Sequence, residues 1–146
     1  SIALGVSALA MVVGLSGCTG EDAINSCTLD AINGSSELSV YSKPGEINFL
    51  GWAVDIENGK VPEKLAIKLQ GDKGKHYIFD YNGVRMERPR VSESLGSDNK
   101  ALNMSGFSFS GDGKALPVDS YAVFLLIYRD EKAVVCPTNK KLIIQG

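Results

Sequence analysis

Residues 120–129 (SYAVFLLIYR) contain an unbroken apolar run from Val123 to Ile127. A half-exposed strand alternates apolar and polar residues, whereas a short stretch that is apolar throughout is typical of a strand buried on both faces. We therefore expect these residues to form a strand in the middle of a β-sandwich.

Seven further segments have strand patterns, and turn signals such as Asn58-Gly59 separate them. In residues 64–70 (KLAIKLQ), Leu65, Ile67 and Leu69 fall on one face, which is the alternation of a half-buried strand. The other segments are residues 37–42 (ELSVYS), 47–55 (INFLGWAVD), 76–81 (HYIFDY), 106–110 (GFSFS), 133–136 (AVVC) and 140–145 (KKLIIQ). Together they predict an all-β fold, an antiparallel immunoglobulin-like β-sandwich of about seven or eight strands.

One polar segment, residues 85–99 (RMERPRVSESLGSDN), does not fit a central strand because it carries Pro89. Pro89 at a first helical position, with Val91 and Leu95 after it, predicts one or two helical turns that end near Gly96. We expect a short helical crossover on the edge of the sandwich.

The N-terminal residues resemble the signal peptide of a bacterial lipoprotein. An uncharged apolar run from Ile2 to Leu15 is followed by Ser16, Gly17 and Cys18, which is the order of a lipobox. The run covers about 14 residues, and a spanning helix needs roughly 20. A buried core helix and an uncleaved single-span anchor are the alternatives. No basic residue precedes the run, so we interpret the chain as a truncated precursor.

The lipobox resemblance implies cleavage before Cys18 and acylation of that cysteine. The predicted organisation is a signal peptide helix (1–17), a lipidated cysteine with its tether (18–26) and one β-sandwich domain (27–146). Lipid would supply the membrane affinity. Thr19 after the cysteine favours the outer membrane, where the domain would face the periplasm or the cell surface. The formal net charge of −2 predicts no nucleic-acid partner.

Cys27 and Cys136 remain as an even pair if Cys18 carries lipid. In an oxidising compartment such a pair predicts a disulfide that ties the two ends of the domain together. A thiolate metal site or a catalytic cysteine is the alternative. Two cysteines with one distant histidine make a poor zinc set, and no Cys-x-x-Cys motif occurs.

Five short motifs resemble a small β-sandwich domain of bacterial envelope proteins. They are Gly51-Trp52-Ala53-Val54-Asp55, Val61-Pro62-Glu63-Lys64, Arg88-Pro89, Ser105-Gly106-Phe107 and Leu116-Pro117-x-x-x-Tyr121. The same domain occurs as the periplasmic tail of membrane proteins that resemble glycosyltransferases. The chain departs from the family pattern at Arg90, where aspartate is usual, and at Asp119, where glycine is usual. The resemblance implies the fold and an envelope location, and it suggests a glycan context.

No catalytic or cofactor motif stands out, so we expect neither an enzyme nor a cofactor or metal requirement. His76, the single histidine, lies in a strand-like segment and is interpreted as an exposed strand residue. Gly-x-Ser-x-Gly, phosphate-binding and calcium-loop motifs are missing. The chain has 17 acidic residues, so a pair of carboxylates suited to glycoside hydrolysis could arise anywhere and does not discriminate.

Trp52, Tyr77, Tyr81, Arg85 and Arg88 are the candidate ligand-binding residues. Trp52 could plug the sandwich core, as a central tryptophan often does, or it could stack on a sugar. The same alternatives apply to the two tyrosines. Arg88 could bind a carboxylate or an acidic glycan at the crossover, or it could brace its own loop.

The sequence leaves three hypotheses for function. The first is a lipid-anchored, non-catalytic domain that binds another envelope protein through an exposed apolar patch or an unpaired sheet edge. The second is a glycan-binding module for surface polysaccharide or peptidoglycan. The third is an envelope hydrolase, which needs a cleft with converging carboxylates.

Overall fold

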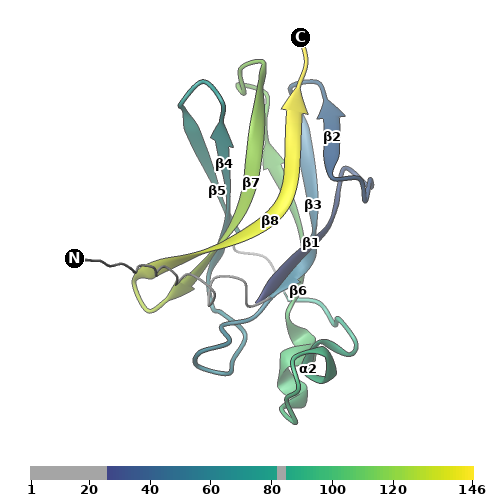
Figure 1. Ribbon diagram of the computed structural model, residues 1–146, viewed down its shortest axis with the longest axis vertical. Coiled ribbons are helices and arrows are strands. Elements are labelled where there is room, and N and C mark those ends of the chain that lie inside the picture. Colours follow the sequence, from purple (N-terminus) through teal and green to yellow (C-terminus); the bar gives the residue numbers. More distant parts are fainter. Residues whose placement is uncertain (1–25, 82–84) are drawn as a thin grey trace, which may run out of the picture.

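The apolar run of residues 123–127 lies in strand β7 (Asp119–Arg129), at the centre of the larger of two sheets. The computed structural model describes residues 26–81 and 85–146. The larger sheet has the strand order β2-β8-β7-β4-β5 (Figure 1). Its other strands are β2 (Ser39–Ser42), β4 (Leu65–Gly71), β5 (His76–Tyr81) and β8 (Lys132–Ile144). The prediction of a central strand here is confirmed.

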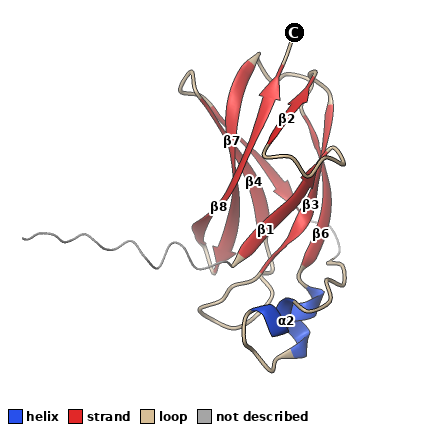
Figure 2. Ribbon diagram, turned by 45° about the vertical axis from the view of Figure 1, so that its right-hand side comes forward, coloured by secondary structure: helices blue, strands red, loops and turns tan. Residues whose placement is uncertain are grey.

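A three-stranded sheet in the order β1-β3-β6 packs face to face with the larger sheet (Figure 2). Its strands are β1 (Cys27–Ile32), β3 (Glu46–Ala53) and β6 (Gly106–Asp112). Side chains from both inner faces, among them Phe49, Phe107, Ile67 and Leu125, are almost fully buried and form one core. The described part of the chain is therefore an all-β sandwich of eight strands, as predicted.

Tyr121, near the start of β7, has the arrangement known as a tyrosine corner. Its hydroxyl donates a hydrogen bond of 2.7 Å to the carbonyl oxygen of Pro117, four residues earlier. This arrangement marks sandwich domains of the immunoglobulin type. Burial raises the pKa of Tyr121, and the nearby Tyr77 and Asp119 raise it further, so the hydroxyl keeps the proton that it donates.

A disulfide joins Cys27 in β1 to Cys136 in β8, and it therefore connects the two sheets. The two cysteines are 109 residues apart in the sequence, and both side chains are buried. A cross-link that closes so long a loop removes much of the entropy of the unfolded chain.

We expect the double substitution Cys27→Ala/Cys136→Ala to lower the free energy of unfolding by about 4–5 kcal/mol, because the unfolded chain regains its loop entropy. Urea unfolding followed by circular dichroism measures this loss. A reducing agent should destabilise the natural chain by a similar amount and leave the variant unchanged. Equal stability of the oxidised and reduced natural chain would contradict the prediction.

Strand β1 was not predicted, and its irregular register explains why. Leu29 pairs with Gly51 and Ala31 pairs with Leu50, so Asp30 is an extra residue that forms a β-bulge. The bulge breaks the alternation of buried and exposed residues, which is the signal that sequence reasoning uses. Cys27 is the first residue of this strand.

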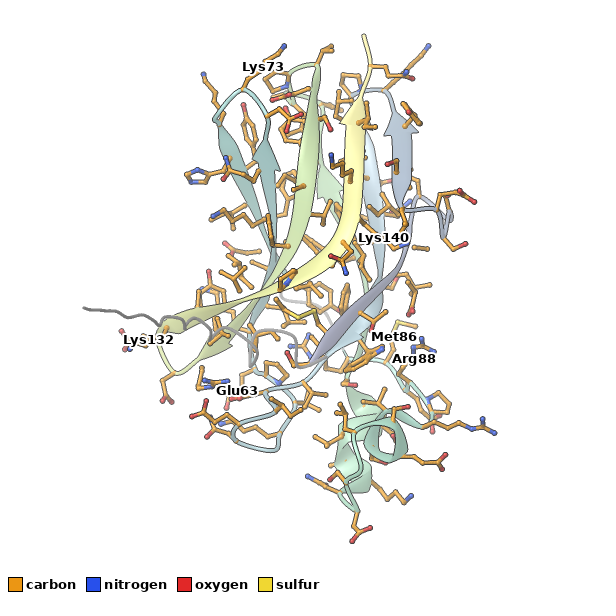
Figure 3. The ribbon with its side chains drawn as sticks, viewed as in Figure 1. Glu63, Lys73, Met86, Arg88, Lys132 and Lys140 are labelled. Carbon is orange, nitrogen blue, oxygen red and sulfur yellow. A yellow bond between two sulfur atoms is a disulfide. The ribbon has the colours of Figure 1, made fainter. Side chains whose placement is uncertain are left out.

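The predicted antiparallel pairing holds for every pair of described strands except one at the edge, where β2 runs parallel to β8. The chain leaves the smaller sheet after β1 and joins the larger sheet as β2. The buried Lys140 of β8 holds this connection, because its ammonium group donates to the carbonyl oxygens of Ser36 and Glu37 at 2.8 and 3.1 Å (Figure 3).

The two strands predicted at 133–136 and 140–145 are one continuous strand, β8. A register shift separates the pair Phe124–Pro137 from the pair Val123–Lys140. Asn139 takes a positive φ of 63° at this bulge, and the Thr138 hydroxyl donates to the carbonyl oxygen of Val123. The polar residues between the two apolar stretches therefore bend the strand without ending it.

The predicted helical crossover exists, but it begins later and lies elsewhere than expected. Helix α2 covers Val91–Ser94 and the 3₁₀ helix η3 covers Lys100–Met104. Arg90, which lies between Pro89 and the first helical residue, has a left-handed conformation with a φ of 74° and is not helical. Pro89 therefore lies before the helix and not at its first position. Figure 2 shows α2 at one end of the sandwich rather than along its edge.

Asp55, just after β3, is fully buried and anchors the following turn. The Arg129 Nε donates to its carboxylate at 3.0 Å, and the Asn58 side-chain amide donates at 2.8 Å. Burial alone would raise the pKa of Asp55, but the hydrogen bonds from Asn58 and Arg129 outweigh it and lower the pKa below the ordinary value of 3.8. The charged form of Asp55 therefore stabilises the folded state.

We expect Asp55→Asn to lower the free energy of unfolding at pH 7 by about 2 kcal/mol, because it removes a buried, charge-assisted hydrogen bond. The Asp55 contribution is complete above the unfolded-state pKa of 3.8 and disappears as the pH falls through the lower folded-state pKa. Urea unfolding between pH 7 and pH 2 should show less acid destabilisation in the variant. Parallel pH profiles for the two chains would contradict this expectation.

The predicted signal peptide helix, Cys18 and the tether, apart from Ser26, lie outside the described residues. Within residues 26–81 and 85–146, no helix is long and apolar enough to cross a membrane.

Candidate functional site

Two large apolar side chains, Leu50 and Met86, are exposed beside each other on the smaller sheet. Leu50 is 44% exposed and Met86 is 45% exposed. Both line one shallow pocket of about 120 Å³. Figure 3 shows Met86 together with Arg88 on the β6 side of the sandwich, above the helical segment.

Leu50 is exposed because of its place in the alternation of β3. Ile47 and Phe49 point into the core, so Leu50 and Trp52 point to the outer face of the sheet. Trp52 is nevertheless only 8% exposed, because Val91 and Leu102 of the helical segment pack over it in a second small hydrophobic cluster. The helical cover stops at Trp52 and leaves Leu50 uncovered.

Met86 reaches this position through a backbone bridge to β6. The Met86 amide donates to the carbonyl oxygen of Gly106 at 2.8 Å, and the Gly106 amide donates back at 2.9 Å. A β-carbon on residue 106 would lie 2.8 Å from the Met86 carbonyl oxygen, so the close approach requires glycine.

The β1 bulge supplies the polar side of the pocket. Asp30, the extra residue of the bulge, accepts a hydrogen bond of 2.9 Å from the Arg88 guanidinium. The bulge lies against Gly51, where a β-carbon would come within 2.2 Å of the Thr28 carbonyl oxygen. The ion pair is partly exposed, so it contributes little stability and mainly fixes the position of Arg88.

The pocket therefore combines an apolar wall with one fixed guanidinium. The buried Arg88 Nε has no hydrogen-bond partner among the described residues, although the same guanidinium holds Asp30. A pocket of this size accommodates one apolar side chain of a partner, with a hydrogen-bond acceptor close to Arg88.

Two carboxylates, Asp30 and Glu87, line the Leu50–Met86 pocket. The Asp30 carboxylate is already paired with Arg88. His76 lies exposed on β5 of the other sheet. Among residues 26–81 and 85–146, no cluster of three or more His, Cys, Asp or Glu side chains could hold a metal ion.

The structure separates the five predicted ligand-binding residues. Trp52 and Tyr81 are buried, so neither offers a ring face for sugar stacking. Trp52 belongs to the second hydrophobic cluster and not to the core that the two sheets enclose. Tyr81 packs against Phe107 and Phe109 inside the sandwich. Tyr77 is half-buried at the other end of β5.

The two arginines brace the fold. Arg85 donates to the Pro62 carbonyl oxygen and lies 5.3 Å from the centre of the Tyr81 ring. Burial lowers the pKa of Arg85, and the interaction with Tyr81 partly offsets this effect. Arg88 braces β1 through Asp30, and of the predicted residues it alone lines the Leu50–Met86 pocket.

Sequence reasoning missed Leu50 and Asp30 as site residues. Alternation along β3 could have placed Leu50 on the face of the strand opposite to that of Phe49. It could not show which residues the helical segment covers. No sequence signal marked Asp30, because its orientation depends on the bulge.

Comparison with protein-family models, with curated proteins and with solved structures finds no match to this chain.

We expect Gly106→Ala to destabilise the domain by about 1–3 kcal/mol, because the new methyl group displaces the Met86 backbone from its bridge. Thermal or urea unfolding measures the loss. Ser108→Ala, at an exposed position on the same strand, is the matched control and should change stability by less than about 0.5 kcal/mol. Equal effects of the two substitutions would show that the close approach is unimportant.

Proposed function

We propose that this chain is a lipid-anchored bacterial envelope protein whose sandwich domain binds another envelope protein without catalysing a reaction. The partner docks on the outer face of the smaller sheet, at the Leu50–Met86 pocket. The observation that carries the proposal is the pairing of two exposed apolar side chains, Leu50 and Met86, with the Arg88 guanidinium that Asp30 holds beside them.

Physical principles of interfaces support this location. Protein interfaces are centred on apolar anchors and arginine, and a polar rim surrounds them. Here Leu50 and Met86 provide the apolar centre, while Glu87, Asp30 and Arg88 provide polar groups around it. A partner would extend the hydrophobic cover that the helical segment begins at Trp52.

The envelope location is supported by two features. The lipobox-like sequence that ends at Cys18 predicts a lipid anchor, and the Cys27–Cys136 disulfide fits an oxidising compartment. The short tether before Ser26 would keep the domain close to the membrane and to other proteins anchored there.

The glycan-binding alternative loses two of its three aromatic candidates, because Trp52 and Tyr81 are buried. It retains Tyr77, which lines a separate pocket at the far end of the sandwich.

Site-specific photocrosslinking in the native cells tests the proposed interface. We expect a photoreactive residue at Leu50 or Met86 of the lipidated chain to crosslink one envelope protein, identified by mass spectrometry. Ile78 on β5 of the opposite sheet is 46% exposed and is the matched control, from which no such product is expected. Crosslinking that is equally strong from Ile78, or absent from both pocket positions, would overturn the proposed interface.

Substitution provides the quantitative arm of the same prediction. Leu50→Glu combined with Met86→Glu should weaken binding of that partner at least tenfold, about 1.4 kcal/mol, because charged groups replace the apolar anchors. Ile78→Glu should leave the affinity unchanged. A Cys18→Ala form tests the anchor separately, since it should abolish crosslinking in cells while leaving the affinity of the isolated proteins intact.

A further inference from the structure

A second pocket lies at the opposite end of the sandwich from the Leu50–Met86 pocket. It forms where the turn between β4 and β5 meets the start of β7, and its volume is about 200 Å³. Its lining residues are Lys73, Lys75, Tyr77, Pro117, Asp119 and Tyr121. Figure 3 shows Lys73 at the end of the molecule farthest from the helical segment, well separated from Met86 and Arg88. The pocket thus combines aromatic rings, two cations and one carboxylate.

Hydrogen bonds between the two segments hold this pocket in shape. The Asp72 amide donates to the Ser120 carbonyl oxygen at 3.0 Å, and the Lys73 amide donates to the Asp119 carboxylate at 3.1 Å. The Lys73 ammonium group donates to the Val118 carbonyl oxygen at 3.0 Å. A preformed pocket loses less conformational entropy when a ligand binds.

Gly71 allows this close junction. A β-carbon at that position would lie 2.4 Å from the Asp119 carboxylate. The Asp119 side chain is therefore held against the turn, with one oxygen toward the Lys73 amide and the other toward the Ser120 amide. Each carboxylate oxygen keeps a further lone pair as an acceptor.

Tyr77 provides an aromatic surface for the pocket. Its ring contacts the ring of Tyr121 edge to face, with centroids 6.0 Å apart and an angle of 75°. The Tyr121 hydroxyl donates a hydrogen bond to the Pro117 carbonyl oxygen, which fixes the position of the Tyr121 ring. The contact between the two rings then restricts the position of Tyr77. Aromatic faces pack well on flat apolar surfaces such as the C–H face of a pyranose ring.

The charges decide which class of ligand suits this surface. The ammonium groups of Lys73 and Lys75 attract an anion. Asp119 would repel a simple anion, and its carboxylate oxygens accept hydrogen bonds only from a ligand with donor groups, such as the hydroxyls of a sugar. A flat, polyhydroxylated anion meets all three requirements.

We propose that this pocket binds a single acidic sugar unit, a pyranose ring that carries a carboxylate or a phosphate group. The pocket is smaller than a drug-sized site, which suits one ring rather than an oligosaccharide. The expected dissociation constant for one such unit is on the order of 1 mM. This site does not depend on the proposed partner interface, because the two pockets share no residue.

Nuclear magnetic resonance titration of the full ¹⁵N-labelled chain tests the proposal with four probes. Galacturonate and galactose 6-phosphate represent the two anionic forms, galactose is the neutral sugar, and benzoate is a flat anion without hydroxyl groups. We expect at least one anionic sugar to shift the amide signals of Lys75, Tyr77 and Ser120, and to bind at least tenfold more tightly than galactose or benzoate. Whichever of these two sugars binds more tightly shows whether the pocket prefers a carboxylate or a phosphate group.

Variants of surface lysines provide the control. Lys75→Glu should weaken binding of that sugar at least tenfold, while Lys100→Glu, at an exposed position in η3, should leave it unchanged. Tyr77→Leu, which keeps an apolar side chain, should also weaken binding. No shift with either anionic sugar, equal binding of galactose or benzoate, or equal effects of Lys75→Glu and Lys100→Glu would overturn the proposal.

Discussion

The pairing of β7 with both of its neighbours is the constraint on which the sandwich depends. β7 pairs with β4 along seven residues and with β8 along eleven, and its side chains Val123, Leu125 and Ile127 enter the core. The smaller sheet buries the apolar face of its three strands against this surface, and the two sheets share one core. The Cys27–Cys136 bond then fixes the two sheets to each other at the β1–β8 contact.

The same sheets leave two surfaces that differ in origin. At one end, the helical segment covers Trp52 and stops short of Leu50, which leaves an incomplete hydrophobic surface beside Arg88. At the other end, tight turns bring Lys73, Asp119 and Tyr77 together without any helical cover. We propose a protein interface at the first surface and a site for a small polar ligand at the second.

Glycines and the bulge make both surfaces possible. Gly51 and Gly106 allow the backbone of β1 and the Met86 segment to approach β3 and β6, and Gly71 allows Asp119 to approach the β4–β5 turn. A side chain at these positions would push β1 away from β3, Met86 away from β6, and Asp119 away from the β4–β5 turn. Local backbone geometry, more than the identity of the charged residues, therefore sets the position of each site.

The sequence by itself determined the strands of the sandwich wherever apolar residues follow the period of a strand, as in β4, β5 and β7. It also indicated the Cys27–Cys136 pair and the turn at Asn58-Gly59. Tertiary structure alone decided three features: the β1 strand with its bulge at Asp30, the parallel pairing of β2 with β8, and the burial of Trp52 under the helical segment. The physical reason is that alternation reports which residues share a face of a strand. Which face is covered, and by what, depends on segments that are distant in sequence and meet only in the folded chain.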